Sequence, residues 1–105
     1  MSKKKTKKPK DPFQKEGKDL RNQLNEWVDD MEDDKCLIAD GFDAAIIGVT
    51  NTLEPIAVYD WDRCVEILIV RDGMSEEDAL EHMSFNVTGA YVGERTPIFI
   101  KLFVR

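Results

Sequence analysis

Four aspartates beside predicted turns and strand ends are the side chains best suited to acid/base or metal chemistry. They are Asp40, Asp43, Asp60 and Asp62. Carboxylates that converge can act as general acid and base or bind a divalent cation. Each also has an ordinary structural use, because aspartate is favoured in turns and at helix N-termini. We therefore expect no catalytic residue here, and a small carboxylate enzyme is our third hypothesis.

Other groups that often carry catalysis occur without the neighbours they need. His82 is the only histidine and lies within an amphipathic helical pattern, where a surface position is its usual role. Cys36 and Cys64 show neither CxxC nor Cys/His spacing, so we expect reduced thiols and no metal site. No strand-GxxxxGK-helix arrangement occurs, so a phosphate loop is not predicted. We expect no cofactor.

The composition indicates one soluble domain. The chain has 105 residues, 42% of them hydrophobic, and no apolar run approaches the roughly 20 residues that span a bilayer. The basic first ten residues are followed by Asp11 and Pro12 rather than by an apolar segment, so they are not read as a secretory signal. We expect a cytoplasmic protein without a membrane association.

Charge is distributed unevenly along the chain. The first ten residues contain six lysines and no acid, so nine basic residues remain against 21 acids and residues 11–105 carry a formal charge of −12. We interpret residues 1–11 as a disordered basic tail. It either lies against the acidic body or grips nucleic-acid phosphates without sequence preference. The lysines of this possible tether are Lys3, Lys4, Lys5, Lys7, Lys8 and Lys10.

An amphipathic N-terminal helix with an acidic C-terminal end is predicted over residues 12–34. Asp11 is a plausible N-cap with Pro12 at the first helical position, while Gly17 weakens the first turn. Trp27 and Trp61 both have helical spacing and are expected in the core. The apolar positions recur on one face and either dock on the domain or meet a partner chain; they are Leu20, Leu24, Trp27, Val28 and Met31.

Residues 35–105 are predicted to form an α+β domain with the order ββααβ. Apolar, β-rich runs lie at 44–50, 56–59 and 98–103. Two helical patterns lie between the second and third runs, and Asp60 and Ser75 are their predicted N-caps. Because the first and last runs are apolar on both faces, we expect a small three-stranded antiparallel sheet with strand order 2-1-3. Helices cover one face of this sheet. The N-terminal helix or a second copy covers the other, where Phe42, Phe99 and Phe103 are candidates for burial.

Several short motifs suggest a family. Asp40-Gly41-Phe42-Asp43 precedes Ile46-Ile47-Gly48-Val49, and Val58-Tyr59-Asp60, Arg71-Asp72-Gly73-Met74-Ser75-Glu76-Glu77, Phe85-Asn86-Val87 and Thr96-Pro97-Ile98-Phe99 follow. This pattern resembles a small family of uncharacterised proteins encoded by tailed bacteriophages, over about residues 40–99. A second acid commonly follows Asp43 in that family, and Ala44 stands there in this chain. The resemblance implies a phage accessory protein of the host cytoplasm and brings no activity, substrate or cofactor.

We therefore expect a non-enzymatic interaction module, monomeric or homodimeric, that binds a host or phage macromolecule. Its acidic body favours a partner protein with a basic surface, in the manner of an inhibitor or DNA mimic. A nucleic-acid-associated protein tethered by the lysine tail is the second hypothesis. The acids expected to contact the partner are Asp29, Asp30, Glu32, Asp33, Asp34, Asp40 and Asp43.

Overall fold

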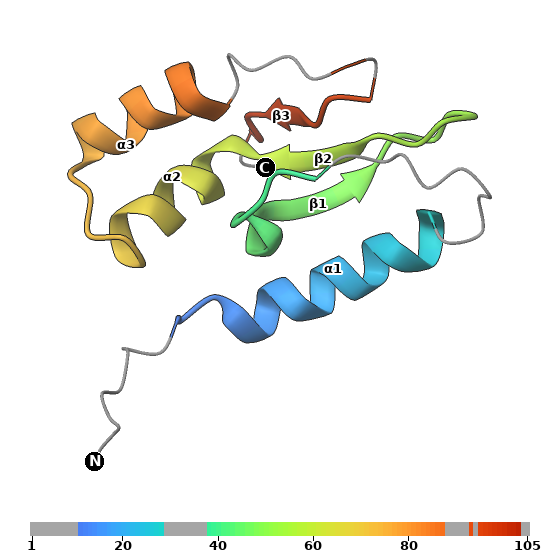
Figure 1. The fold of residues 1–105 in the computed structure, drawn as a ribbon, viewed down its shortest axis with the longest axis horizontal. Helices are drawn as coiled ribbons and strands as arrows, with labels where there is room; N and C mark the ends of the chain where they lie inside the picture. Colours follow the sequence, from blue (N-terminus) through green and yellow to red (C-terminus); the bar gives the residue numbers. More distant parts are fainter. Residues whose placement is uncertain (1–10, 29–37, 88–92, 94, 104–105) are drawn as a thin grey trace.

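The fold is α+β, with three helices and one three-stranded sheet (Figure 1). The computed structural model describes residues 11–28, 38–87, 93 and 95–103, so the tail lysines and the acids of residues 29–34 lie outside the described residues. Among the described helices, none is long and apolar enough to cross a bilayer. The elements are α1 (Gln14–Val28), the 3-10 turn η1 (Asp43–Ala45), β1 (Ile46–Val49), β2 (Ala57–Asp60), α2 (Trp61–Val70), α3 (Glu76–His82), the π-helical turn η2 (Met83–Val87) and β3 (Ile98–Ile100).

The sheet order is β1-β2-β3, so the predicted order 2-1-3 is wrong. β1 pairs antiparallel with β2 as expected, but β3 pairs parallel with β2, with Tyr59 opposite Phe99. Burial explains the difference. Ala57 and Tyr59 of β2 are fully buried, whereas Ile47 of β1 is 43% exposed, so β2 is the strand that needs neighbours on both sides. The α2–α3 segment is long enough for the crossover that a parallel pair requires.

Tyr59 is the centre of the core. Its ring is fully buried and stacks on the Phe99 ring at a centroid distance of 5.2 Å. Its hydroxyl accepts a 2.8 Å hydrogen bond from the backbone N–H of Ala39, which ties the segment before η1 to β2. The apolar face of α2 packs beside it with Ile67 and Leu68 at most 2% exposed. The Tyr59 side chain thus connects β2 and β3 with the segment that leads into β1, within the same core as the apolar face of α2.

Helix starts follow the capping residues read from the sequence. The Asp60 carboxylate accepts from the N–H groups of Asp62 and Arg63 at 3.0 and 3.4 Å, and the Ser75 hydroxyl accepts from Asp78 at 3.1 Å. Asp11 accepts from the N–H of Phe13 at 2.9 Å, just before α1 begins. The caps at Asp60 and Ser75 are confirmed, because an N-cap depends only on residues two or three positions away. The helix start predicted at Pro12 is wrong by two residues, because Pro12 and Phe13 form a turn and α1 begins at Gln14.

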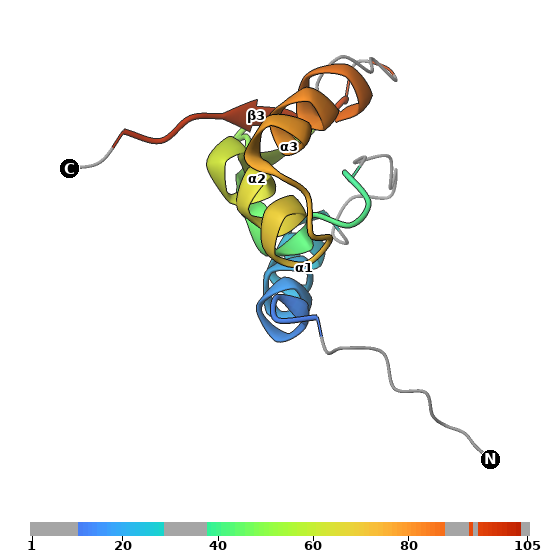
Figure 2. The same cartoon turned by 90° about the vertical axis from the view of Figure 1, so that its left-hand side faces the viewer.

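Helix α1 runs alongside β1, on the side of the molecule opposite α3 (Figures 1 and 2). Leu24 is buried, but Trp27 is 63% exposed, so its expected place in the core is wrong. The face of α1 that carries Leu20, Leu24 and Trp27 lies opposite all four residues Ile46–Val49, across a groove of about 110 Å³. Consecutive strand residues point to opposite faces, so α1 covers the edge of β1 rather than a sheet face. An edge offers less apolar surface than a face, and Trp27 stays outside.

Of the other residues expected in the core, some are buried and one is exposed. Trp61 and Phe99 are partly buried and pack against the core, and Phe42 is 5% exposed. Phe103 is 88% exposed and lies beyond β3, which ends at Ile100, so α1 does not bury it. The prediction that the N-terminal helix buries Phe103 is therefore wrong.

The Cys64 thiol is free and fully buried, and Cys36 lies outside the described residues. Burial, aided by the charge of Asp60, raises its pKa from 9.0 to about 12. At pH 8 the native thiolate fraction should be about 1,000-fold below that of the unfolded chain. We therefore expect iodoacetamide to alkylate Cys64 at least 100-fold faster in urea than in the folded protein, measured in a Cys36→Ser variant.

The same shift sets a direction for alkaline stability. The folded chain holds the Cys64 proton more tightly than the unfolded chain, so the stabilisation is fully present below pH 9 and is lost as pH rises towards 12. Similar alkylation rates in the folded and unfolded protein would contradict the burial of this thiol.

Candidate functional site

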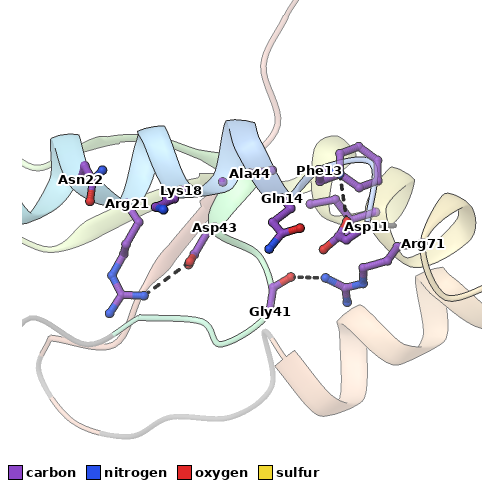
Figure 3. Close-up of a pocket in the computed structure, with 12 residues that line it drawn as sticks. Asp11, Phe13, Gln14, Lys18, Arg21, Asn22, Gly41, Asp43, Ala44 and Arg71 are labelled. Carbon is purple, nitrogen blue, oxygen red and sulfur yellow. Dashed lines mark hydrogen bonds and ion pairs between the residues drawn. The ribbon is translucent and has the colours of Figure 1, made fainter. Parts of the chain in front are cut away.

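A hollow lies between α1, the turn of residues 40–44 and the end of α2. Its volume is about 450 Å³. Figure 3 shows the side chains of α1 on one wall and Arg71 approaching from α2 on another. The charged groups that line it are Asp11, Lys18, Arg21, Asp43 and Arg71. Arg71 is already paired with Asp72, so the remaining charges of the lining balance, with Lys18 and Arg21 against Asp11 and Asp43.

Gly17 sets the distance between α1 and η1. A Cβ at this position would lie 3.2 Å from the Asp43 Cβ and 3.2 Å from the Ala44 backbone nitrogen. The helix can approach this closely only because glycine has no side chain. The residue that weakens the first turn of α1 is therefore what brings its polar face to the turn that carries Asp43.

Arg71 holds the second wall in place. Its Nη1 donates to the Gly41 carbonyl at 2.6 Å, while Nε and Nη2 donate to Asp72 at 2.8 and 3.0 Å. The hydrogen bonds with Asp72 raise the pKa of Arg71 and lower that of Asp72, so both groups are charged at neutral pH. Gly41, which accepts one of these hydrogen bonds, has φ +93, a conformation that residues with a side chain rarely adopt. Because three of its nitrogens already donate to Gly41 and Asp72, the Arg71 guanidinium has little capacity left for another molecule.

Arg21 and Asp43 form the least satisfied pair in the hollow. Arg21 Nη1 lies 3.4 Å from Asp43 Oδ2, at the long end for an ion pair (Figure 3). Arg21 Nε and Asp43 Oδ1 are both buried and have no hydrogen-bond partner in the described part of the chain. An unmatched buried polar atom costs about 1–3 kcal/mol and calls for water, an ion or a ligand. Both residues line the hollow, but these two atoms have almost no accessible surface, so a molecule in the hollow reaches them only when the Arg21 and Asp43 side chains turn toward it.

The described lining combines charged and amide groups with the apolar side chains of Phe13, Ala44 and Ile67. No serine, threonine, cysteine, histidine or tyrosine is among the described residues that line the hollow. Over the described residues, no group of three or more metal-ligating side chains is close enough to hold a metal ion. Charged and amide groups around an apolar floor are typical of small-molecule sites.

The four aspartates proposed for an active site have different partners. Asp40 is exposed in the turn and Asp43 faces Arg21. Asp60 caps α2, and Asp62 lies 3.3 Å from the Lys101 ammonium. Of the acids expected to contact a partner, only Asp40 and Asp43 fall within the described residues.

Of the charged residues that line the hollow, Asp43 was a candidate from the sequence, whereas Lys18, Arg21 and Arg71 were not. Lys18 and Arg21 are three positions apart and hence share one helix face, so a search for basic pairs on the first helix would have found them. The approach of Arg71 to Gly41 had no local signal, because thirty residues separate the two.

A second surface is defined by the acids of α3. Glu76, Glu77, Asp78 and Glu81 are all exposed, and none forms an ion pair within the described residues. The arginines, in contrast, are used internally. Arg63 contacts Glu16 and Glu66, and Arg95 donates to the Pro55 carbonyl at 3.2 and 2.6 Å. Within the described part of the chain, the arginines are held by internal contacts, whereas the acids of α3 remain exposed.

Comparisons with protein-family models, with curated proteins and with solved structures found no match to this chain.

Proposed function

We propose that this protein is a non-enzymatic binding module that attaches to a basic surface of a host or phage protein. The supporting observation is the charge balance of the described residues, where 15 acidic side chains face 7 basic ones. Uncompensated charge of one sign steers association with a partner of the opposite sign and speeds the encounter. A surface that normally holds nucleic acid is the natural target, as for an inhibitor or DNA mimic in the cytoplasm.

The contact surface in this proposal is centred on α3. Glu76, Glu77 and Asp78 lie in the first turn, where the helix dipole favours acids and local stability alone explains them. Glu81 lies beyond the first turn, where the dipole no longer favours an acid, because the helical backbone continues from α3 into η2. Helix stability therefore does not account for Glu81, and a role in binding would.

The predicted contact set changes accordingly. Asp40 is exposed and stays in the proposal, together with the acids of residues 29–34, which lie outside the described residues. Asp43 is left out, because its carboxylate is half-buried against Arg21. Glu76, Glu77, Asp78 and Glu81 are added.

The test replaces three acids of α3 without removing its N-cap. We expect the triple variant Glu76→Gln, Glu77→Gln, Glu81→Gln to lose at least tenfold in affinity for a protein captured by the wild type from host lysate. The wild-type interaction should weaken as salt rises from 0.05 to 0.5 M, because the Debye length shortens from above about 10 Å to below it. Affinity is measured by titrating the purified partner at each salt concentration.

A matched control separates a specific surface from total charge. The variant Asp19→Asn, Glu26→Gln, Glu54→Gln removes the same number of exposed charges from α1 and the β1–β2 turn. It should bind as the wild type does. Equal losses in both variants, or no loss in the α3 variant, would refute an α3 contact. Retention of DNA by the full chain that disappears on deletion of residues 1–10 would instead favour the lysine tether.

A further inference from the structure

We infer that the hollow between α1 and the turn of residues 40–44 binds a small organic anion that also carries hydroxyl or amine donors. The ligand class is a phosphorylated or carboxylated molecule of about the size of a triose or pentose phosphate. This site is separate from the acidic surface of α3, and neither proposal depends on the other.

The anionic group of the ligand is recognised by α1. Lys18 and Arg21 lie one turn apart on the face that lines the hollow. Lys18 is exposed and forms no ion pair with the described residues, and Arg21 Nε is buried without an acceptor. Once the partly exposed guanidinium turns toward the hollow, a phosphate or carboxylate oxygen supplies the acceptor that Nε lacks, and charge-assisted hydrogen bonds of this kind are strong.

The hydroxyl or amine of the ligand is recognised by Asp43. Its Oδ1 is buried without a donor, while Oδ2 already faces Arg21. A simple anion would meet this carboxylate as a like charge. A molecule with a donor group next to its anionic group satisfies both orphan atoms at once, and this combination defines the ligand class.

The dimensions and the remaining walls fit a small molecule. A volume of about 450 Å³ lies within the range of roughly 300–1,000 Å³ typical of small-molecule sites. Gln14 and Asn22 add amide groups at the rim. Arg71 is held by Asp72 and the Gly41 carbonyl, so it shapes the wall and is not counted among the ligand contacts.

The experiment is a titration of the full ¹⁵N-labelled chain with glycerol 3-phosphate, and separately with inorganic phosphate, followed by amide chemical shifts. We expect saturable shifts within residues 17–22 and 40–44 for both probes. Glycerol 3-phosphate should bind at least fivefold more tightly, because its hydroxyls reach Asp43. Absence of saturable shifts for both probes, or equal affinity for the two, would overturn the inference.

Two variants and one control assign the contacts. Lys18→Gln should weaken glycerol 3-phosphate at least fivefold, while Lys15→Gln, on the same helix but outside the lining, should leave it unchanged. Asp43→Asn should tighten inorganic phosphate and reduce the preference for glycerol 3-phosphate. Equal effects of Lys15→Gln and Lys18→Gln would show general charge attraction and would refute the site. The exposed position of both lysines keeps the variants folded, which circular dichroism verifies.

Discussion

Replacing Tyr59 with alanine is expected to lower the free energy of unfolding by about 3–5 kcal/mol, the usual range for removing a buried aromatic ring. The ring is fully buried and stacks on Phe99, so its loss leaves a cavity between β2 and β3. Small domains are stable by only about 5–15 kcal/mol, so this single change removes much of the total. Urea unfolding followed by circular dichroism measures the difference.

The variant Tyr59→Phe separates packing from hydrogen bonding. It keeps the ring but leaves the Ala39 N–H without its 2.8 Å acceptor, so we expect a loss of about 1–3 kcal/mol. Hydrogen exchange at Ala39 should accelerate by more than exchange at α2. If Tyr59→Ala and Tyr59→Phe had the same stability as the wild type, the placement of this side chain at the centre of the core would be wrong.

Replacing Gly17 with leucine is expected to cost about 2 kcal/mol and to abolish binding in the hollow. The first atom of the new side chain would already lie 3.2 Å from the backbone nitrogen of Ala44 and from the Asp43 Cβ. Overpacking of this kind typically costs about 1–3 kcal/mol. Because α1 must move away from η1, Arg21 also leaves Asp43. Unfolding in urea and the glycerol 3-phosphate titration report the two effects.

Gly17→Ala is the graded control. Alanine gains about 1 kcal/mol of helix propensity over glycine, and it introduces only the Cβ contact at 3.2 Å. We expect these effects to offset one another, so that stability changes by less than about 1 kcal/mol. A leucine variant as stable as the alanine variant would mean that α1 does not rest on η1 through this residue.

Local signals account for the part of the fold that the sequence predicts well. The caps at Asp60 and Ser75 each act within three residues, and both are present in the structure. The α+β class follows from short β-rich runs separated by helical periodicity, which is equally local. The antiparallel β1–β2 hairpin needs only the short turn that connects its strands.

Features that depend on distant contacts were missed. Residues 44–50 are apolar on both faces of the predicted strand, which suggested a central strand. In the structure β1 is an edge strand, with Ile47 exposed and its open edge covered by α1. Sequence periodicity reports how much surface is apolar and does not say which element covers it. The exposed Trp27 has the same cause.

The hollow was missed for a related reason. Gly17 reads as an unfavourable helix residue, and its benefit is visible only when Asp43 and Ala44 are placed beside it. Arg71 reads as a helix-end cation, and its bond to Gly41 requires α2 and the turn before η1 to be assembled. Asp43 was identified as a candidate, but its partner Arg21 lies on α1. The sequence predicts this helix without showing where it packs against the rest of the domain.

The parallel pairing of β3 with β2 implies an order of assembly. Val49 pairs with Ala57 across a short turn, whereas Val58 pairs with Ile98 across a long segment that contains α2 and α3. Each doubling of a closed loop adds about 0.6 kcal/mol of entropic cost, and non-local pairings slow folding. The hairpin therefore forms first and β3 docks last. Until it does, the Tyr59 ring has no Phe99 to stack on, and the nascent core remains open on that side.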